Sequence, residues 1–367
     1  MKLGEQNVLF FSRTMGMGGT SNVMLQLCEI LQPLVNKIVV CSRGGVMTAR
    51  LEEMGIRHYT IGDIGVKDPK TAVSVLRDLN RIIRSEEITL VHTHHRMAAF
   101  YTRLVMGKNR FVFFNTSHNT FADNRLLTRF AYARANLIAC GDMVKKNLVD
   151  FFGLPESQVS VVHNAIRPFR GQIMPDGIIT QLHDQGKFVI ANVGHLAEQK
   201  GMEYYLQAVP SVIRKAPDAC FLVIGSGEDE EKLKKLAKTL GIEEYVFFMG
   251  YRTDVQNLLA QTDLVVLSSL WEGLPLTPLE AFSVGKTIVA TAVDGTPEIV
   301  LDGENGLLVP ARDSAALAEK ILYLIGNADA RGAMERRAQQ HFETDFSFER
   351  FAEKYIGCYK EKLHERT

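Results

Sequence analysis

A short segment beginning at Trp271 combines two carboxylates with the signals of a helix start. It reads Trp271-Glu272-Gly273-Leu274-Pro275-Leu276-Thr277-Pro278-Leu279-Glu280. Thr277 and Glu280 have the spacing of a capping box with Pro278 at the first helical position, which gives Glu280 a structural role but leaves Glu272 unexplained. The alternative is a bound diphosphate, because free N–H groups and the positive dipole end of a helix favour anions. Carboxylates beside it would accept hydrogen bonds from sugar and ribose hydroxyls.

A second group of polar residues follows the apolar run 188–193. It contains Gly194 and His195, then Lys200 and Gly201. The carboxyl ends of parallel strands meet at one edge of a sheet, which is where ligands bind in open parallel sheets. We therefore expect Lys200 to reach the same phosphates as the segment after 264–267.

A glycine cluster in the first half of the chain has an equivalent position. Gly16-Met17-Gly18-Gly19 follows the apolar run 8–11 and opens a helical stretch. The cluster fits either a tight strand-to-helix turn or a loop that lets a ligand approach the backbone. Its spacing differs from the Gly-x-Gly-x-x-Gly motif of dinucleotide-binding proteins.

Histidines follow two further apolar runs. His92, His94 and His95 come after 90–91, and His118 comes after 111–114. Alternation along a strand puts His92 and His94 on one face, but no third residue with metal-ligand spacing follows. We expect packing and hydrogen bonding for His92 and pocket lining for His94 and His95. His118 fits either a loop position or the same pocket.

Apolar runs and helix-length amphipathic stretches alternate twice along the chain. The runs are rich in Val, Ile and Phe and nearly continuous, as in strands buried on both faces. They are 8–11, 37–41, 90–91, 111–114, 137–139, 159–162, 188–193, 220–224, 246–249, 264–267, 287–290 and 306–309. This alternation predicts an α/β protein of two Rossmann-like parallel-sheet domains. The polar clusters at the carboxyl edges of both predicted sheets indicate that the two domains face one central cleft.

The domain boundary is expected between 166 and 187, where Pro168, Pro175 and three glycines occur without an apolar period. We predict a first domain over 1–168, a second over 187–345 and a final helix over 346–367. Aromatic residues at helical spacing in 348–363 predict that this helix packs back onto the first domain.

Bulk properties exclude several classes of protein. The 367 residues suit two domains, and 46% hydrophobic with 23% charged residues is ordinary for a globular chain. Lys plus Arg equals Asp plus Glu at 42 each, so we expect no nucleic-acid partner. Five scattered cysteines, no signal peptide and no bilayer-spanning run predict a cytoplasmic protein, and any membrane contact is expected to be peripheral.

Taken in order, these segments resemble the retaining GT-B glycosyltransferases of family 4. The Glu-x7-Glu motif of the family matches Glu272 and Glu280, and its phosphate loop matches residues 16–19. Its Val-Gly-Arg-Leu…Lys-Gly pattern matches Val193-Gly194-His195-Leu196…Lys200-Gly201. Also typical are Asn164-Ala165-Ile166, Gly295-Thr296-Pro297-Glu298 and Gly303-Glu304-Asn305-Gly306. The resemblance covers nearly the whole chain.

The resemblance implies a fold, a reaction and a set of site residues. The first domain would hold the acceptor, the second the donor, and the final helix would cross back to the first. A sugar would move with retention from a UDP- or GDP-sugar to an acceptor hydroxyl in surface glycan or glycolipid biosynthesis, without metal or cofactor. The implied catalytic residues are His118, Lys200 and Glu272, and the implied donor-binding residues are Gly18, Gly19, His195, Lys200, Gly273, Leu274, Leu276, Thr277 and Glu280.

In this scheme Glu280 binds the ribose, and Glu272 faces the transferred sugar. Lys200 and His195 neutralise the diphosphate. The family usually has Arg at position 195, and His is charged only part of the time near neutral pH, so donor binding is expected to be weaker or pH-sensitive. Two alternatives share the architecture: a nucleotide-sugar epimerase and a non-catalytic sugar-nucleotide binding module.

The acceptor is not specified by these motifs. Basic residues lie among aromatic ones in the first half of the chain, namely Arg103, Lys108, Arg110, Arg125, Arg129 and Arg134. This region fits either a solvated helix face beside buried strands or a surface that rests on an anionic membrane. The second interpretation implies a lipid-linked acceptor.

Overall fold

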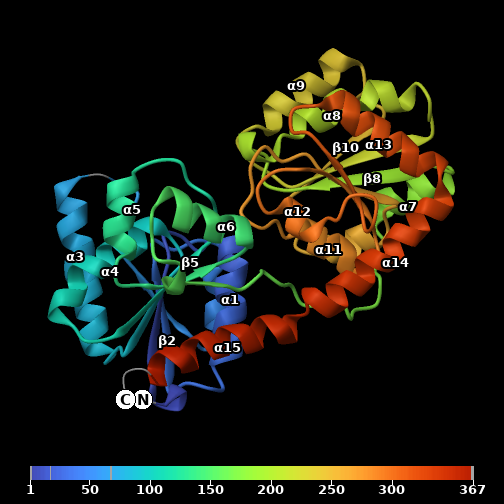
Figure 1. Ribbon diagram of the computed structural model, residues 1–367. Coiled ribbons are helices and arrows are strands. Elements are labelled where there is room, and N and C mark those ends of the chain that lie inside the picture. Colours follow the sequence, from blue (N-terminus) through green and yellow to red (C-terminus); the bar gives the residue numbers. More distant parts are fainter. Residues whose placement is uncertain (1, 17, 67, 365–367) are drawn as a thin grey trace. The chain divides into compact units, whose positions relative to one another are not determined.

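The computed structural model describes residues 2–16, 18–66 and 68–364, which fall into two compact units (Figure 1). The first unit contains the chain up to Asn164 together with residues from Glu349 onward, and the second contains Ala165–Phe348. The division therefore falls just before the linker that the sequence predicts. Each unit is built on one parallel sheet.

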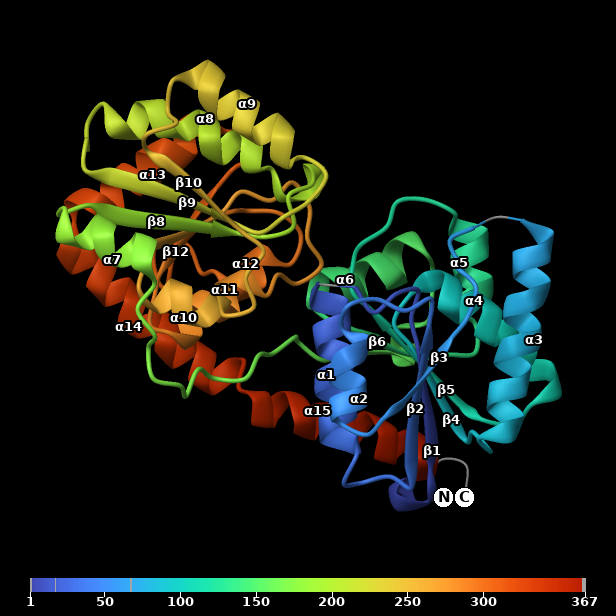
Figure 2. The same cartoon turned by 180° about the vertical axis from the view of Figure 1, so that it is seen from behind.

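The first sheet has seven strands in the order β3-β2-β1-β4-β5-β6-β7, all parallel. They are β1 (Asn7–Phe11), β2 (Lys37–Ser42), β3 (Arg57–Thr60), β4 (Leu90–Thr93), β5 (Val112–Ser117), β6 (Asn136–Ala139) and β7 (Val159–Val161). The helices are α1 (Gly19–Leu31), α2 (Thr48–Glu53), α3 (Pro69–Ser85), α4 (Arg96–Val105), α5 (Arg125–Tyr132), α6 (Asp142–Lys146) and α15 (Phe348–His364). Seen from both sides, α3, α4 and α5 cover one face and α1 and α15 the other (Figures 1 and 2).

The second sheet has six parallel strands in the order β10-β9-β8-β11-β12-β13. They are β8 (Phe188–Val193), β9 (Ala219–Ile224), β10 (Val246–Gly250), β11 (Leu264–Leu267), β12 (Ile288–Thr291) and β13 (Leu307–Val309). The helices are α7 (Gly177–Asp184), α8 (Met202–Ile213), α9 (Glu230–Leu240), α10 (Val255–Ala260), α11 (Thr277–Ser283), α12 (Thr296–Ile299), α13 (Ser314–Gly326) and α14 (Ala328–Asp345). Short helical segments are η1 (Leu3–Glu5), η2 (Met106–Lys108), η3 (Asn147–Phe151), η4 (Glu156–Gln158) and η5 (Glu198–Lys200).

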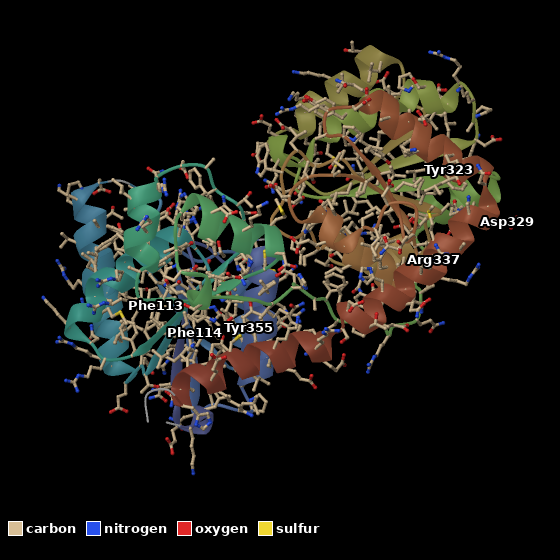
Figure 3. The ribbon with its side chains drawn as sticks, viewed as in Figure 1. Phe113, Phe114, Tyr323, Asp329, Arg337 and Tyr355 are labelled. Atoms are coloured by element: carbon tan, nitrogen blue, oxygen red, sulfur yellow. The ribbon has the colours of Figure 1, made fainter. Side chains whose placement is uncertain are left out.

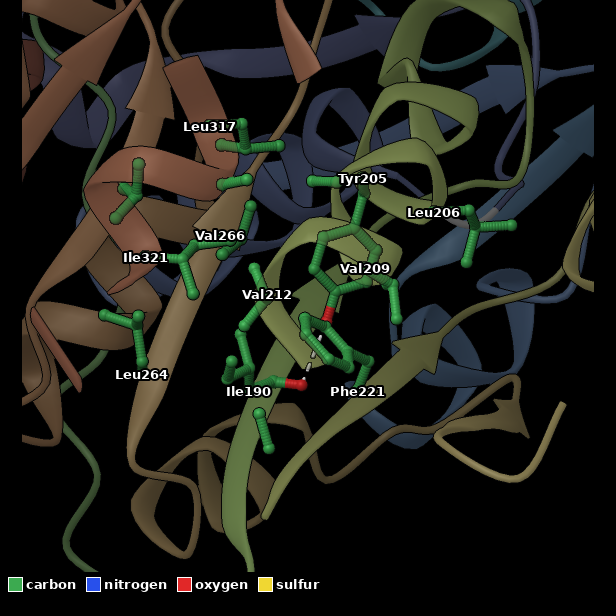
Figure 4. Packing of buried hydrophobic residues seen from close by; sticks show 14 of the residues in the cluster. Ile190, Tyr205, Leu206, Val209, Val212, Phe221, Leu264, Val266, Leu317 and Ile321 are labelled. Carbon is green, nitrogen blue, oxygen red and sulfur yellow. Dashed lines mark hydrogen bonds between the residues drawn. The ribbon is translucent and has the colours of Figure 1, made fainter. Parts of the chain in front are cut away.

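The core of the second unit lies between its sheet and the layer of α8 and α13 (Figure 4). Tyr205 of α8 is fully buried, and its hydroxyl donates to the carbonyl of Ile190 at 2.9 Å. The polar end of this large side chain is thus satisfied within an apolar layer. Truncating such a buried side chain to Ala costs about 3–5 kcal/mol, so this layer fixes the strands whose ends form the site below.

The final helix, α15, contributes to the core of the first unit. Tyr355, labelled in Figure 3, has its hydroxyl 3.1 Å from Oγ1 of Thr116. The hydroxyl of Tyr359 lies 2.6 Å from Nδ1 of His92, and both tyrosines are fully buried. Helix α15 therefore completes the core of a unit whose other described residues all come before Ala165.

Each predicted apolar run overlaps a strand, which confirms two Rossmann-like parallel sheets. The sequence analysis missed β3, because Arg57-His58-Tyr59-Thr60 is polar and lies at the sheet edge, half exposed. The cysteines are free; Cys358 is half-buried and the others are buried. Within the described residues, none of the helices has the length and apolar character that crossing a bilayer requires. The cleft between the domains stays a prediction.

Candidate active site

Lys200 and Glu272 form an ion pair at the carboxyl edge of the second sheet. Lys200 ends η5 after β8, Glu272 follows β11, and these neighbouring strands flank the point where the strand order reverses. Nζ of Lys200 lies 2.5 Å from Oε1 of Glu272, and the two side chains are 19% and 7% exposed. An ammonium has three N–H donors, so Lys200 keeps donors for an anionic ligand while it is paired.

Close approaches between backbones hold the loops that carry this pair. Gly201 has φ 55°, and a Cβ there would lie 2.2 Å from the carbonyl oxygen of Ser268, so a side chain at 201 would separate the Lys200 loop from β11. A Cβ on Gly295 would lie 2.1 Å from the carbonyl oxygen of Gly273. Both glycines therefore keep the strand-end loops of the second sheet in contact.

Two further residues fix Glu272, and the sequence analysis did not select either of them as a site residue. Oγ of Ser269 donates to Oε1 of Glu272 at 2.7 Å. The backbone N–H of Glu272 donates to the carboxylate of Asp294 at 2.8 Å. The position of Ser269 at a strand end was the available signal, whereas Asp294 comes from the distant loop after β12 and only the fold brings it close.

Glu280 lies in the first turn of α11, and its carboxylate has no hydrogen bond within the described part of the chain. The predicted capping box is wrong. Leu276 is the N-cap without a side-chain cap, and the hydroxyl of Thr277 donates to the carbonyl of Val193 at 3.5 Å instead. Desolvation raises the pKa of Glu280 to about 7, although the charge of Lys200 opposes the shift. A half-buried carboxylate without a partner is available to a ligand.

His195 follows β8 at the same edge but points into solvent. Its Nε2 lies 2.9 Å from a carboxylate oxygen of Glu228, and the two side chains are 61% and 70% exposed. A pair this exposed contributes little to stability, so a diphosphate would displace Glu228 at little cost.

Gly18 and Gly19 begin α1 at the carboxyl end of β1. Gly18 is the N-cap of α1 with φ 147°, and a Cβ at this position would meet open space. Met17, which belongs to the same predicted loop, lies outside the described residues. The backbone at Gly18 is thus accessible to a ligand, which agrees with either interpretation of the cluster.

His118 and His94 form a stacked pair at the carboxyl edge of the first sheet. Their ring centroids are 5.3 Å apart, and Nδ1 of His94 lies 3.0 Å from Nε2 of His118. Desolvation lowers the pKa of His118 to about 4 and lowers the pKa of His94 well below its usual value, with the neighbouring histidine charges as smaller causes. Both rings are therefore neutral near pH 7, and His118 can act on a ligand as a neutral hydrogen-bonding group.

The other two histidines have structural partners. His92 is buried between Tyr359 and Thr116, with its Nε2 2.8 Å from Oγ1 of Thr116, as the packing prediction required. His95 is the N-cap of α4, where its Nδ1 accepts a hydrogen bond from the N–H of Met97 at 3.1 Å. The sequence analysis missed this cap because histidine is not a preferred N-cap residue.

A basic and apolar surface lies on α5. Leu126 is 83% exposed and Phe130 is 41% exposed, although both side chains are large and apolar. The guanidinium of Arg103 lies 5.2 Å from the centre of the Phe130 ring, and that of Arg125 lies 6.0 Å from the Phe151 ring. Exposed apolar side chains thus alternate with arginines on one helix, which favours the second interpretation of this region.

Two family models match the chain, one in each unit. The model described as "Glycosyltransferase Family 4" matches residues 17–170, and the model described as "Glycosyl transferases group 1" matches residues 178–341. Together with the two parallel sheets, these matches show that the chain belongs to the family 4 glycosyltransferases of GT-B fold. The protein is therefore a glycosyltransferase.

Relatives and solved structures agree with this assignment. The N-acetyl-alpha-D-glucosaminyl L-malate synthase of Bacillus anthracis is 24% identical over 85% of this chain and 84% of that protein. The UDP-Gal:alpha-D-GlcNAc-diphosphoundecaprenol alpha-1,3-galactosyltransferase of Escherichia coli is 25% identical over 81% of this chain and 82% of its own length. Anabaena Alr3699/HepE in complex with UDP-glucose matches 97% of this chain and 100% of that chain with TM-score 0.84 and 20% identity. At this identity the structural likeness shows the fold alone.

Proposed function

We propose that the protein transfers a sugar from a UDP- or GDP-sugar to an acceptor hydroxyl with retention of anomeric configuration, in surface glycan or glycolipid biosynthesis. The observation that carries this proposal is the pair Lys200–Glu272 beside the unpartnered carboxylate of Glu280, all at the carboxyl edge of the second sheet. A cation for the diphosphate and a carboxylate for ribose hydroxyls are what a nucleotide-sugar donor needs there.

Each residue has a role in this scheme. Lys200 and His195 balance the charge of the diphosphate, with the backbone N–H groups between 273 and 277, other than at Pro275, on the phosphates and sugar. Glu280 accepts from the ribose hydroxyls, and Glu272 faces the transferred sugar. In the first unit, Gly18 and Gly19 let the donor approach the backbone, and His118 hydrogen-bonds the reacting sugar as a neutral ring.

The chemistry follows from charge development on the leaving group. As the bond between the sugar and the phosphate oxygen breaks, the nucleoside diphosphate gains negative charge, which Lys200 and His195 stabilise electrostatically. Lys200, together with His195 when it is protonated, supplies the positive charge that a divalent cation would supply, so the proposed reaction needs no metal. The acceptor hydroxyl attacks from the face of the leaving group and passes its proton to a phosphate oxygen.

Support for the donor and acceptor classes comes from the relatives. The Escherichia coli relative is named for UDP-Gal and a diphosphoundecaprenol acceptor, and the Anabaena structure contains UDP-glucose. The acceptor in this proposal is a glycan or is linked to a lipid. The exposed Leu126 and Phe130 favour the lipid-linked one, with α5 resting on the inner face of the cytoplasmic membrane. Co-sedimentation with anionic liposomes should then be lost in Arg125→Glu/Arg129→Glu protein; unchanged sedimentation would remove the membrane contact from the proposal.

A panel of UDP-, GDP- and ADP-sugars tests the function. Thermal shift identifies the donor that binds, and release of nucleoside diphosphate is then measured with and without a glycan acceptor. Acceptor-dependent release, with product of the donor's anomeric configuration by NMR, is the expected result. An isomerised donor would indicate an epimerase, binding without turnover would indicate a binding module, and inversion would contradict the proposed stereochemistry.

A further inference from the structure

Two arginines of the first unit lie side by side at the carboxyl edge of its sheet. In the pairing of β1 with β2, Phe11 is opposite Cys41, and the N–H of Arg43 donates to the carbonyl of Arg13 at 3.0 Å just beyond these strands. Asp63, in the loop after β3, lies between the two guanidinium groups. Its carboxylate accepts from Nε of Arg13 at 2.8 Å and from a terminal nitrogen of Arg43 at 2.8 Å.

One carboxylate balances only one of the two cations. The backbone N–H of Gly65 also donates to Asp63 at 2.8 Å, and together these donors hold the pKa of that carboxyl far below its usual range. Asp63 is therefore ionised and the trio carries one net positive charge at every working pH. Asp63 bridges the two guanidinium groups and reduces their mutual repulsion, but one positive charge of the trio stays uncompensated.

The two arginines keep donors that face solvent. The side chains of Arg13 and Arg43 are 44% and 55% exposed, whereas Asp63 is 17% exposed. Arg13 contacts Asp63 through two of its five N–H donors and Arg43 through one of its five. The carboxylate thus orients both planar groups, and their remaining N–H donors suit an oxyanion with several oxygen atoms.

Two neighbours within the described residues, His95 and Arg96, do not neutralise this charge. His95, across β1 at the end of β4, is neutral because burial and then the charges of Arg13 and Arg96 lower its pKa to about 4. Arg96 is paired with Asp123 at 2.6 Å. The net positive charge therefore stays at the edge where open parallel sheets bind ligands.

We propose that Arg13 and Arg43, oriented by Asp63, bind an oxyanion of the acceptor, either a phosphate or a carboxylate group. The inference rests on the proposed function in one respect, namely that the first unit holds the acceptor. It adds the chemical class: the acceptor of this enzyme is anionic near its reacting hydroxyl.

The same sheet contains a matched control at its opposite edge. Lys37 and Arg57, at the starts of β2 and β3, share the carboxylate of Glu86 at 2.8 and 3.1 Å. This trio also has two cations and one carboxylate, but it lies at the amino edge, and the hydroxyl of Tyr59 donates to the same carboxylate. An anion that binds specifically at the carboxyl edge should depend on the first trio and not on the second. General attraction of an anion to positive charge should depend on both trios equally.

The test is calorimetric titration of the full chain with inorganic pyrophosphate and, separately, with succinate, in the presence of saturating UDP so that the donor site is occupied. Arg13→Gln and Arg43→Gln should each weaken binding of at least one anion about tenfold, as expected for losing a charge-assisted hydrogen bond. Arg57→Gln should leave both affinities within twofold. Preference for pyrophosphate identifies a phosphorylated acceptor, and preference for succinate identifies a carboxylated one.

One further variant and one check on folding keep the result decisive. Arg13→Lys keeps the charge and loses the planar fork, so it should bind more weakly than the parent; equal affinity would overturn the clamp geometry. Arg43→Gln keeps the Arg13–Asp63 contact, so weaker binding in a variant with an unchanged melting temperature cannot be misfolding. Equal losses in Arg57→Gln and Arg13→Gln, or no loss in the latter, would overturn the proposal. If UDP does not bind, GDP takes its place in the titration. Failure of both nucleotides to bind would count against the proposed function and not against the anion site, because the anion titration can be repeated without nucleotide.

Discussion

The carboxyl edges of the two sheets have the same strand order around their central strands but hold their polar groups in different ways. In the second unit, Glu272 is paired with Lys200, and Glu280 is a carboxylate whose pKa is raised to about 7. In the first unit, His94 and His118 are desolvated, neutral rings. One topology thus supports charged groups around Lys200 in the second unit and neutral rings around His94 in the first, because strand-end loops, rather than strands, carry the site residues.

The difference predicts opposite responses of the two units to acid. A histidine with a lowered pKa in the folded state contributes stability above its unfolded pKa of 6.5 and loses it as pH falls below that value. A glutamate with a raised pKa behaves in the opposite sense, because the folded state keeps its proton between pH 4.5 and about 7. Acid should therefore weaken the first unit while Glu280 slightly favours the second.

Hydrogen exchange at pH 7.5 and pH 5, corrected for intrinsic rates, tests this contrast. At pH 5 the first unit should lose roughly 2 kcal/mol for each of the buried rings of His92 and His94, with His95 and His118 acting in the same direction. Amides of β1, β4 and β5 should lose protection, and those of β8 and β9 should not. Equal losses in both sheets would contradict the comparison.

Replacing Lys200, the cation at the carboxyl edge of the second sheet, should reduce activity by a free energy comparable with the loss of stability predicted above. Lys200→Ala should lower nucleoside diphosphate release by about 10²–10³-fold, because the leaving group loses its charge partner. Lys187→Ala is the matched control, since Lys187 also forms an ion pair, with Asp218 at 2.9 Å, at the other end of the same strand. If Lys200→Ala turns over as fast as Lys187→Ala, Lys200 has no part in the reaction.

Glu280→Gln should separate stability from binding. Above pH 7 the variant removes a desolvated charge, so we expect it to be more stable than the parent by roughly 2 kcal/mol, discounted for partial exposure. It should nevertheless bind the donor about tenfold more weakly, because an amide is a poorer acceptor for ribose hydroxyls. Urea unfolding at pH 8 and pH 5 and UDP-sugar titration measure the two effects.

The control for Glu280 is Glu353→Gln on the exposed side of α15, which should change neither quantity. A stabilisation of Glu280→Gln that is the same at pH 5 and pH 8 would show that its charge is not the cause. Undiminished donor binding would remove Glu280 from the site.

The smallest predicted effect concerns the first unit. Tyr359→Phe removes the hydroxyl that lies 2.6 Å from Nδ1 of buried His92, and should destabilise the unit by about 1–2 kcal/mol. Tyr323→Phe is the control, because Tyr323 is 45% exposed on α13 (Figure 3). If Tyr359→Phe and Tyr323→Phe have equal unfolding midpoints, the contact between Tyr359 and His92 adds no stability.

Much of the fold could be predicted because buried parallel strands are nearly continuous apolar runs. The runs at 188–193 and 264–267 coincide with β8 and β11, while the polar edge strand β3 gave no such signal. Residues at strand ends could be predicted in the same way, since topology alone brings Lys200 and Glu272 to one edge.

What could not be predicted depends on three-dimensional partners. The capping box at Thr277 and Glu280 has the right spacing, yet the hydroxyl of Thr277 finds the carbonyl of Val193 on a neighbouring strand. The pairing of Lys200 with Glu272 and the sharing of Asp63 by two arginines likewise join residues far apart in sequence. Single-sequence patterns report local preferences, and these contacts are not local.

The final helix has a consequence for how the chain is made. Tyr355 and Tyr359 leave the ribosome after the whole second unit, yet they complete the core of the first unit. Domains generally fold as units during synthesis. Since the second unit ends at Phe348, it can fold while the first still lacks its closing helix. A nascent chain at that point would expose the apolar surface around Phe114 and His92, which makes it a natural client for chaperones.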